Sequence, residues 1–205
     1  MYRRFVKRGL DIALSAVGVV ILAIPMLVCA LVVKLDSPGP VLFWQKRVGI
    51  HKKTFMMPKF RTMYTNTPAN MPTHLLTDPQ RWITRSGRWF RKLSLDELPQ
   101  IFSILFGQMS IIGPRPALWN QEDLIAERDL YGANDIRPGL TGWAQIHGRD
   151  ELEIGEKARL DGYYTENLSF RLDLKCFFGT IFSVLRQEGV VEGGTGAMER
   201  DRAGK

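Results

Sequence analysis

The sequence contains one long uncharged segment near its start. Residues 12–33, IALSAVGVVILAIPMLVCALVV, lie between Asp11 and Lys34. As a straight helix rising ~1.5 Å per residue, this segment would be about 33 Å long, which is enough to cross the hydrocarbon core of a bilayer. It is longer than the roughly 7–15 apolar residues of a signal peptide, and no A-x-A cleavage pattern follows it, so we expect it to be retained.

Basic residues flank this segment on both sides. Because basic flanks favour the cytoplasm, a single straight span would place one of the two flanks on the wrong side. Pro25 lies near the middle, where it removes a helix hydrogen bond and costs ~3 kcal/mol. We therefore predict a re-entrant helix-break-helix over residues 1–35, with Pro25 at the break; the alternative is one ordinary span that tolerates the proline. The flanking residues are Arg3, Arg4, Lys7 and Arg8 before the segment, and Lys46, Arg47, Lys52, Lys53, Lys59 and Arg61 after it.

Length and charge limit the remainder of the chain. With 205 residues, we expect one cytosolic domain over residues 36–188 and a disordered, Gly-rich tail over residues 189–205. The net charge of +7 favours a polyanionic partner, which could be nucleic acid, anionic lipid or a phosphorylated substrate. The 2 cysteines and 3 histidines have no metal-ligand spacing.

Local patterns predict an α+β domain that is mostly helical. The runs "VLFWQKRVG" and "KTFMMPKFRTM" predict a short β-hairpin. Two later segments have apolar residues on one helical face, and each face could pack in the core or lie in a membrane interface. These residues are Leu98, Ile101, Phe102, Leu105 and Met109 in the first segment, and Leu174, Phe177, Phe178, Ile181, Phe182 and Leu185 in the second.

Two adjacent acids, Asp96 and Glu97, precede the first of these apolar segments. The sequence from Ser94 to Glu97 matches a capping box, which would make the acids merely the start of a helix. Pro99 argues against that interpretation, because proline suits the first position of a helix and disrupts the second turn. We therefore expect the acids in the turn just before a helix N-terminus, where backbone N–H groups favour anions.

Basic residues on turns stiffened by proline or glycine accompany the two acids. Planar guanidinium groups in such turns suit bidentate binding of phosphate oxygens, which together predicts a diphosphate site. A carboxylate there could attack phosphorus, and a hard cation such as Mg²⁺ would offset the repulsion between carboxylates and phosphates. The candidate phosphate-binding residues are Lys59, Arg61, Arg91, Arg115, Arg137 and Arg149.

Several of these motifs, in this order, resemble the bacterial sugar transferases, more narrowly the small monotopic phosphoglycosyl transferases. The resemblance covers nearly the whole chain, and its motifs are "YRRFVKRGLDI", "SPGPVLFWQKRVG", "MPKFRTM", "FRKLSLDELPQIFSIL", "GQMSIIGPRPAL", "RPGLTGWAQIHGR" and "YYTENLSFRLDLK". In that family, a phospho-sugar moves from a UDP-sugar to undecaprenyl phosphate and UMP is released. The family's usual Ser-Pro break is Ile24-Pro25 in this chain.

The resemblance implies roles for individual residues. Asp96 would be the nucleophile that forms a covalent phospho-sugar intermediate, and Glu97 would help to bind Mg²⁺. Asp96, Glu97 and Asp173 would be the metal ligands. Arg91, Arg115 and Arg149 would lie at or near the phosphates, and Lys59 and Arg61 lie on a matching motif.

The resemblance also implies the partners and the location. We expect the catalytic domain on the cytoplasmic face of the inner membrane, with membrane lipid as a partner and no nucleic acid. The motif wording favours an N-acetylated amino sugar. An apolar helix face could also serve a second copy of the chain, so a homodimer is one expectation. The rival hypotheses are a noncatalytic membrane scaffold and a basic nucleic-acid-binding protein. The second is suggested by Trp82, Trp89 and Phe90, which lie among arginines.

Overall fold

The computed structural model describes residues 1–67, 79–148 and 152–186. In these ranges the chain is mostly helical and contains a short antiparallel hairpin, as the sequence predicts. The predictions for Arg149 and for the tail 189–205 lie outside the described residues.

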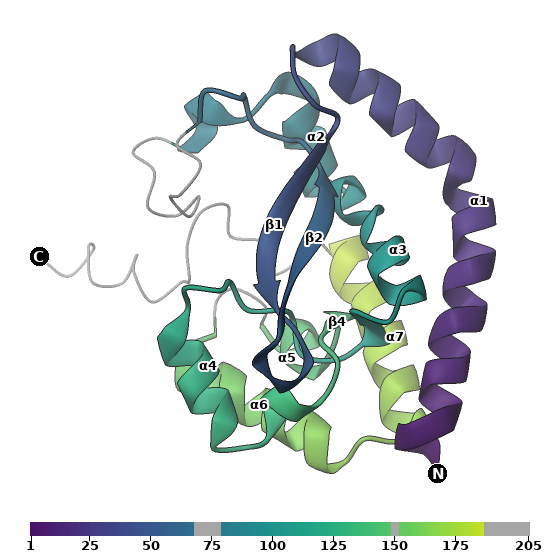
Figure 1. Cartoon of the computed structure of the whole chain (residues 1–205), viewed down its shortest axis with the longest axis vertical. Coiled ribbons are helices and arrows are strands. Elements are labelled where there is room, and N and C mark those ends of the chain that lie inside the picture. Colours follow the sequence, from purple (N-terminus) through teal and green to yellow (C-terminus); the bar gives the residue numbers. More distant parts are fainter. Residues whose placement is uncertain (68–78, 149–151, 187–205) are drawn as a thin grey trace, which may run out of the picture.

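The apolar segment forms one continuous helix, α1 (Lys7–Asp36), which follows the short turn η1 (Tyr2–Val6). The helix continues through Pro25, so the expected interruption is not found. Proline removes one backbone hydrogen bond without ending the helix. Helix α1 curves along one side of the domain (Figure 1), as long helices that pack on a core commonly do. By length and composition, α1 could cross a membrane.

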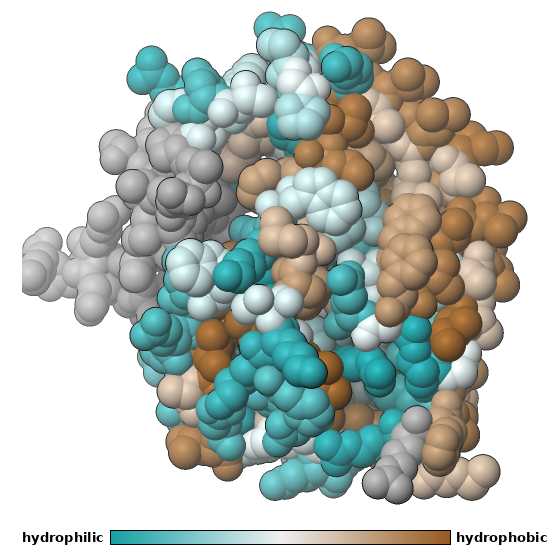
Figure 2. All heavy atoms as spheres, viewed as in Figure 1, coloured by the Kyte–Doolittle hydropathy of each residue, from teal (hydrophilic) through white to brown (hydrophobic). Residues whose placement is uncertain are grey.

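One face of α1 is apolar and exposed from Ile12 to Leu35. Figure 2 shows a band of hydrophobic residues along the side of the molecule where α1 lies. Residues on the opposite face, among them Asp11, Ser15, Cys29 and Val33, are buried against the domain. The exposed residues are Ile12, Leu14, Val17, Val20, Ile21, Ile24, Leu27, Val28, Leu31, Val32 and Leu35.

The hairpin pairs β1 (Leu42–Val48) with β2 (Thr54–Phe60), and the turn η2 (Ile50–Lys52) connects the two strands. Alternation along β2 places Met57 and Lys59 on the same face of the hairpin. Met57 packs in a buried cluster with Ile104 and Met109. This packing fixes the face on which Lys59 extends.

A second, parallel pair joins β3 (Ser110–Ile112) to β4 (Gly139–Thr141). The two backbones approach so closely that only glycine fits at the contact. A Cβ at Gly139 would lie 2.1 Å from the Gly113 backbone nitrogen, and a Cβ at Gly142 would lie 2.2 Å from the Gly113 oxygen. This contact positions the turn after β3, which carries Arg115.

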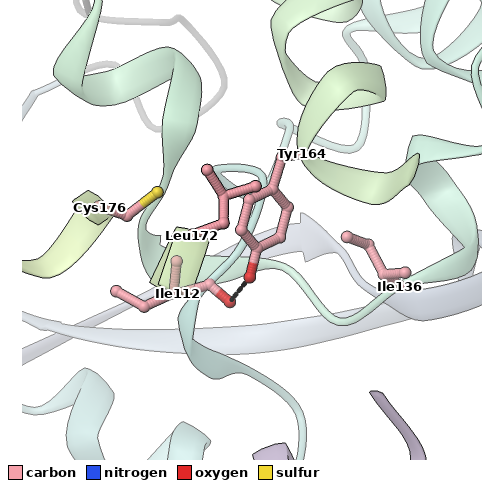
Figure 3. Packing of buried hydrophobic residues seen from close by; sticks show 5 residues of the cluster. All are labelled: Ile112, Ile136, Tyr164, Leu172 and Cys176. Carbon is pink, nitrogen blue, oxygen red and sulfur yellow. Dashed lines mark hydrogen bonds between the residues drawn. The ribbon is translucent and has the colours of Figure 1, made fainter. Parts of the chain in front are cut away.

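The other helices enclose these strands. Figure 3 shows the main buried cluster, in which Tyr164 packs beside Ile112, Ile136, Leu172 and Cys176, and the Tyr164 hydroxyl donates a 3.2 Å hydrogen bond to the Ile112 oxygen. The remaining elements are η4 (Pro79–Trp82), α2 (Arg85–Lys92), η5 (Leu95–Glu97), α3 (Gln100–Leu105), α4 (Glu122–Asp129), η6 (Ala133–Asp135), α5 (Trp143–Ile146), α6 (Ile154–Glu166) and α7 (Phe170–Arg186).

The two segments that the sequence predicts to be amphipathic helices both contain a helix, but they differ in length and in what their apolar residues contact. The first is shorter than its pattern suggests, because α3 ends at Leu105 and Gly107 adopts a φ of 85°, after which Met109 lies in the core. The second forms α7, whose core contacts come from Leu172 and Cys176. The predicted apolar stripe of α7 is exposed at Leu174, Phe177, Phe178, Ile181 and Phe182, so packing in the core is excluded for those residues.

Candidate active site

The two acids lie in the turn η5, directly before α3. Ser94 makes no capping hydrogen bond and has a left-handed backbone, with φ 55°, so the capping-box interpretation is wrong. Pro99 is the N-cap of α3, which begins at Gln100. The expectation drawn from Pro99, that Asp96 and Glu97 precede a helix N-terminus, is confirmed.

Three segments that are distant in the sequence meet at Glu97. Lys59 Nζ, from β2, lies 2.9 Å from Glu97 Oε1, and Arg115 Nη2, from the turn after β3, lies 2.5 Å from the same oxygen. Lys59 Nζ is also 3.9 Å from Asp96 Oδ2, which is longer than a hydrogen bond. Among the described residues, no hydrogen bond reaches the Asp96 carboxylate. Glu97 is therefore tightly paired, whereas Asp96 has one longer ion pair with Lys59 and accepts no hydrogen bond from Lys59 or Arg115.

The electrostatic environments of the two acids differ in the same way. Burial raises the pKa of Asp96, and the charge of Glu97 adds to this rise, while Lys59, Arg91 and Arg115 partly oppose it. Burial also acts to raise the pKa of Glu97, but Arg115 and Lys59 outweigh it, so the Glu97 pKa is lowered. Two adjacent carboxyl groups with opposite pKa shifts are typical of sites where the two groups have different chemical roles.

Arg91 completes the positive surroundings of the acids. Its Nε donates a 3.0 Å hydrogen bond to Thr62 Oγ1, which fixes the guanidinium on the inner side of α2. Its charge acts on Asp96. Lys59 and Arg115 thus contact Glu97, and Arg91 adds positive charge that acts on Asp96.

Arg61 and Arg137 lie elsewhere and bind backbone. Arg61 is 5% exposed, and its guanidinium donates to Ser37 Oγ, the Ser37 oxygen and the Pro40 oxygen at the end of α1. Arg137 Nε donates to the Gly107 oxygen. Both arginines hold turns, and in this structure neither one contacts the acid pair.

Asp173 also does not join the acid pair. Its carboxylate accepts hydrogen bonds from Tyr2 (2.6 Å), Lys7 (2.7 Å) and Tyr164 (2.5 Å). Among the described residues, no three His, Cys, Asp or Glu side chains form a group that could hold a metal. The expected set of three carboxylate ligands is therefore not formed. Mg²⁺ often binds through one or two carboxylates together with substrate phosphates, and Asp96 and Glu97 alone fit that pattern.

Sequence reasoning missed the charged residues in the first turns of α1. Arg8 donates from Nη1 to the Ile104 oxygen (2.7 Å) and from Nη2 to the Leu105 oxygen (2.8 Å), at the C-terminus of α3. Asp11 accepts hydrogen bonds from the Ser110 hydroxyl (3.0 Å) and the Ile111 amide (2.9 Å). An acid at the edge of an otherwise apolar helix was the available signal, because a buried carboxylate requires partners.

The far end of α1 binds the same domain. Asp36 accepts hydrogen bonds from the Ser86 amide (3.0 Å) and hydroxyl (2.7 Å). Cys29 and Val33 pack with Phe60 and Phe90. Both ends of the apolar helix are therefore attached to the unit that carries the acid pair.

The chain matches the family of bacterial sugar transferases over residues 2–187 and belongs to that family. It is 40% identical over 184 residues to the uncharacterized sugar transferase EpsL of Bacillus subtilis, covering 90% of this chain and 89% of that protein.

Two further relatives have more specific names. The UDP-N-acetylgalactosamine-undecaprenyl-phosphate N-acetylgalactosaminephosphotransferase of Aeromonas hydrophila is 39% identical, covering 88% of this chain and 44% of that protein. The UDP-glucose:undecaprenyl-phosphate glucose-1-phosphate transferase of Escherichia coli is 40% identical, covering 87% of this chain and 40% of that protein. The chain thus spans less than half the length of these two relatives.

Proposed function

We propose that this protein transfers a sugar 1-phosphate from a UDP-sugar to undecaprenyl phosphate and releases UMP, as a step in glycan biosynthesis. The names of the relatives support the reaction class. The observation that carries the proposal is the acid pair itself: Lys59 and Arg115 hold Glu97 in place, and Asp96 lies beside it with Lys59 3.9 Å away, beyond hydrogen-bond distance.

In the proposed reaction, an Asp96 oxygen attacks the β-phosphorus of the UDP-sugar. The bond from that phosphorus to the bridging oxygen breaks, UMP leaves with the oxygen, and an aspartyl phospho-sugar remains. A phosphate oxygen of undecaprenyl phosphate then attacks the same phosphorus, which forms the lipid diphosphate sugar and frees the Asp96 carboxylate. Arg91 and Arg115 would stabilise the charge on the phosphate oxygens in both steps.

Glu97 and Lys59 would position the groups around the Asp96 carboxylate. The Glu97 carboxylate fixes the Lys59 ammonium 3.9 Å from Asp96, close enough to lower the cost of a buried negative charge. Asp96 and Glu97 are also the residues that would hold Mg²⁺, which when bound would neutralise phosphate charge. Removal of divalent cations with EDTA is therefore expected to stop turnover.

The contacts of α1 support a re-entrant, monotopic arrangement in the membrane. Arg8 and Asp36, at opposite ends of the helix, both bind the catalytic unit. A polar domain on one side of a bilayer cannot contact both ends of a helix that crosses it. The basic residues on both flanks favour the cytoplasmic side, and the curvature of α1 would let its exposed apolar face enter one leaflet.

A UMP-release assay tests the proposed reaction. The full chain in nanodiscs is incubated with Mg²⁺, undecaprenyl phosphate and a panel of UDP-sugars that includes N-acetylated amino sugars, which are the expected donors. Asp96→Asn should abolish UMP release, whereas Asp135→Asn, which changes an acid that is 62% exposed, should leave it unchanged. Substantial activity in Asp96→Asn would refute the nucleophile assignment. UMP release with none of a broad panel would favour the noncatalytic scaffold.

A further inference from the structure

Helix α2 lies against the last turns of α1 through one of its faces. Phe90 is buried with Cys29 and Val33, and Ser86 binds the Asp36 carboxylate. Gly87 is also buried, and its amide donates to the Thr84 hydroxyl that caps the helix. The position of α2 is therefore fixed at the C-terminal end of the apolar helix.

The opposite face of α2 carries three basic and two apolar side chains. At 100° per residue these side chains fall within an arc of about 140°. All are exposed, with Trp89 at 65% and Leu93 at 52%, and Lys92 Nζ lies 6.0 Å from the centre of the Trp89 ring. We refer to this surface as the α2 outer face: Arg85, Arg88, Trp89, Lys92 and Leu93.

The α2 outer face has an uncompensated positive charge. In the part of the chain that the structure describes, Arg85, Arg88 and Lys92 form no ion pair within 4.0 Å. The nearby acid, Asp36, lies within the influence of Arg85, but its carboxylate is already bound by Ser86. Arg91 points to the other side of the helix, toward Thr62, and belongs to the active site.

We propose that the α2 outer face binds the phosphate headgroups of anionic lipids. This inference rests on the membrane association proposed above. The exposed apolar face of α1 continues to Leu35, which is 85% exposed, so the end of α1 next to α2 lies at headgroup depth. Tryptophan is enriched at that depth, and basic residues near an anionic surface are attracted to it.

Lipid selectivity at Trp89 gives the direct test. The full chain is placed in nanodiscs that contain brominated phosphatidylglycerol or brominated phosphatidylcholine, and the Trp89 signal is obtained as wild type minus Trp89→Phe. Anionic lipid should quench Trp89 several-fold more efficiently per molecule than zwitterionic lipid, and 1 M salt should reduce this preference.

Matched charge variants complete the test. Arg88→Gln/Lys92→Gln should lower the preference for the anionic lipid several-fold, because each basic residue near such a surface contributes up to about fivefold and two are removed. Lys53→Gln/Arg159→Gln removes the same charge from exposed positions elsewhere and should leave the preference unchanged.

Each other outcome would overturn the inference in a recognisable way. Equal quenching of Trp89 by both lipids would place α2 at the membrane without headgroup selectivity. Absence of quenching, in protein that still floats with vesicles, would place α2 away from the bilayer. Failure to float with any vesicles would instead refute the membrane association on which the inference rests.

Discussion

Arg8 links the apolar helix to the element that follows the acid pair. Its guanidinium donates two hydrogen bonds, of 2.7 and 2.8 Å, to the last carbonyl groups of α3. Both carbonyl groups lie in the last turn of α3, where the helix itself supplies no donor, and the Ile104 oxygen also accepts a 3.0 Å hydrogen bond from the Gly107 amide. Arg8→Ala should therefore destabilise the protein and disturb the turn that holds Asp96.

The size of the effect follows from these two bonds. A hydrogen bond to a charged group contributes about 1.5–3 kcal/mol, and water can replace part of that because the contacts are only partly buried. We expect a total loss of about 2–3 kcal/mol. For a chain of this size, that corresponds to a fall in Tm of about 4–12 °C.

Thermal unfolding in nanodiscs measures the loss directly. Arg8→Lys keeps the charge and can reach one carbonyl group, so its Tm should fall between those of the wild type and Arg8→Ala. Arg3→Ala, at an exposed position, should change stability by less than about 0.5 kcal/mol. If Arg8→Ala and Arg3→Ala had equal Tm values, the two contacts would contribute nothing and the reasoning would fail.

Three further predictions concern other parts of the structure. Gly139→Ala should cost about 3 kcal/mol in denaturant unfolding, because its Cβ would meet the Gly113 backbone at 2.1 Å. Gly155→Ala, with nothing within 4 Å of the added Cβ, should be neutral or stabilising, and equal costs for the two variants would contradict this. Arg128→Met should cost about 3–5 kcal/mol, because it leaves Asp161 buried without its 2.6 Å partner, and adding Asp161→Leu should recover most of that loss; a double variant as unstable as the single one would contradict this. The Glu97 pKa is lowered on folding, so its ionised form contributes full stability above the unfolded pKa of about 4.3. Below that pH the unfolded state takes up a proton while native Glu97 stays ionised, and the contribution falls until the lower folded pKa is reached. Wild type should therefore lose stability between about pH 5 and 3 faster than Glu97→Gln does, and equal slopes would argue against the shift.

The sequence predicts those parts of the site that depend on local pattern. Alternation and turn residues predict the hairpin that carries Lys59, and Pro99 predicts the helix start that follows Asp96 and Glu97. The arginine in the "GPRP" turn is predicted because proline stiffens its surroundings, and Arg115 does bind Glu97.

The predictions that fail concern Arg61 and Asp173, whose positions depend on contacts between distant segments. Arg61 is only two residues from Lys59 along the chain, and strand alternation would place both on one face, yet Arg61 binds Ser37 just after α1. Strand β2 ends at Phe60, so its alternation does not extend to Arg61. Asp173 binds Lys7, a residue 166 positions away, and no local sequence pattern predicts such a pair. A charged residue at the edge of an apolar helix can set the orientation of that helix in a membrane, or it can form an ion pair with a distant part of the chain. Both roles have the same local sequence pattern.

The attachment of α1 at both ends has a consequence for how such a protein can be divided. The predicted boundary near residue 35 separates the apolar helix from the domain along the chain, but Lys7, Arg8 and Asp11 fill binding positions inside that domain. Cutting at residue 35 would leave the Asp173 carboxylate and the Ser110 hydroxyl without these partners, so the excised domain should not be a faithful soluble version of the enzyme. Protein engineers who want a soluble form would do better to keep α1 and replace its outward apolar side chains with polar ones.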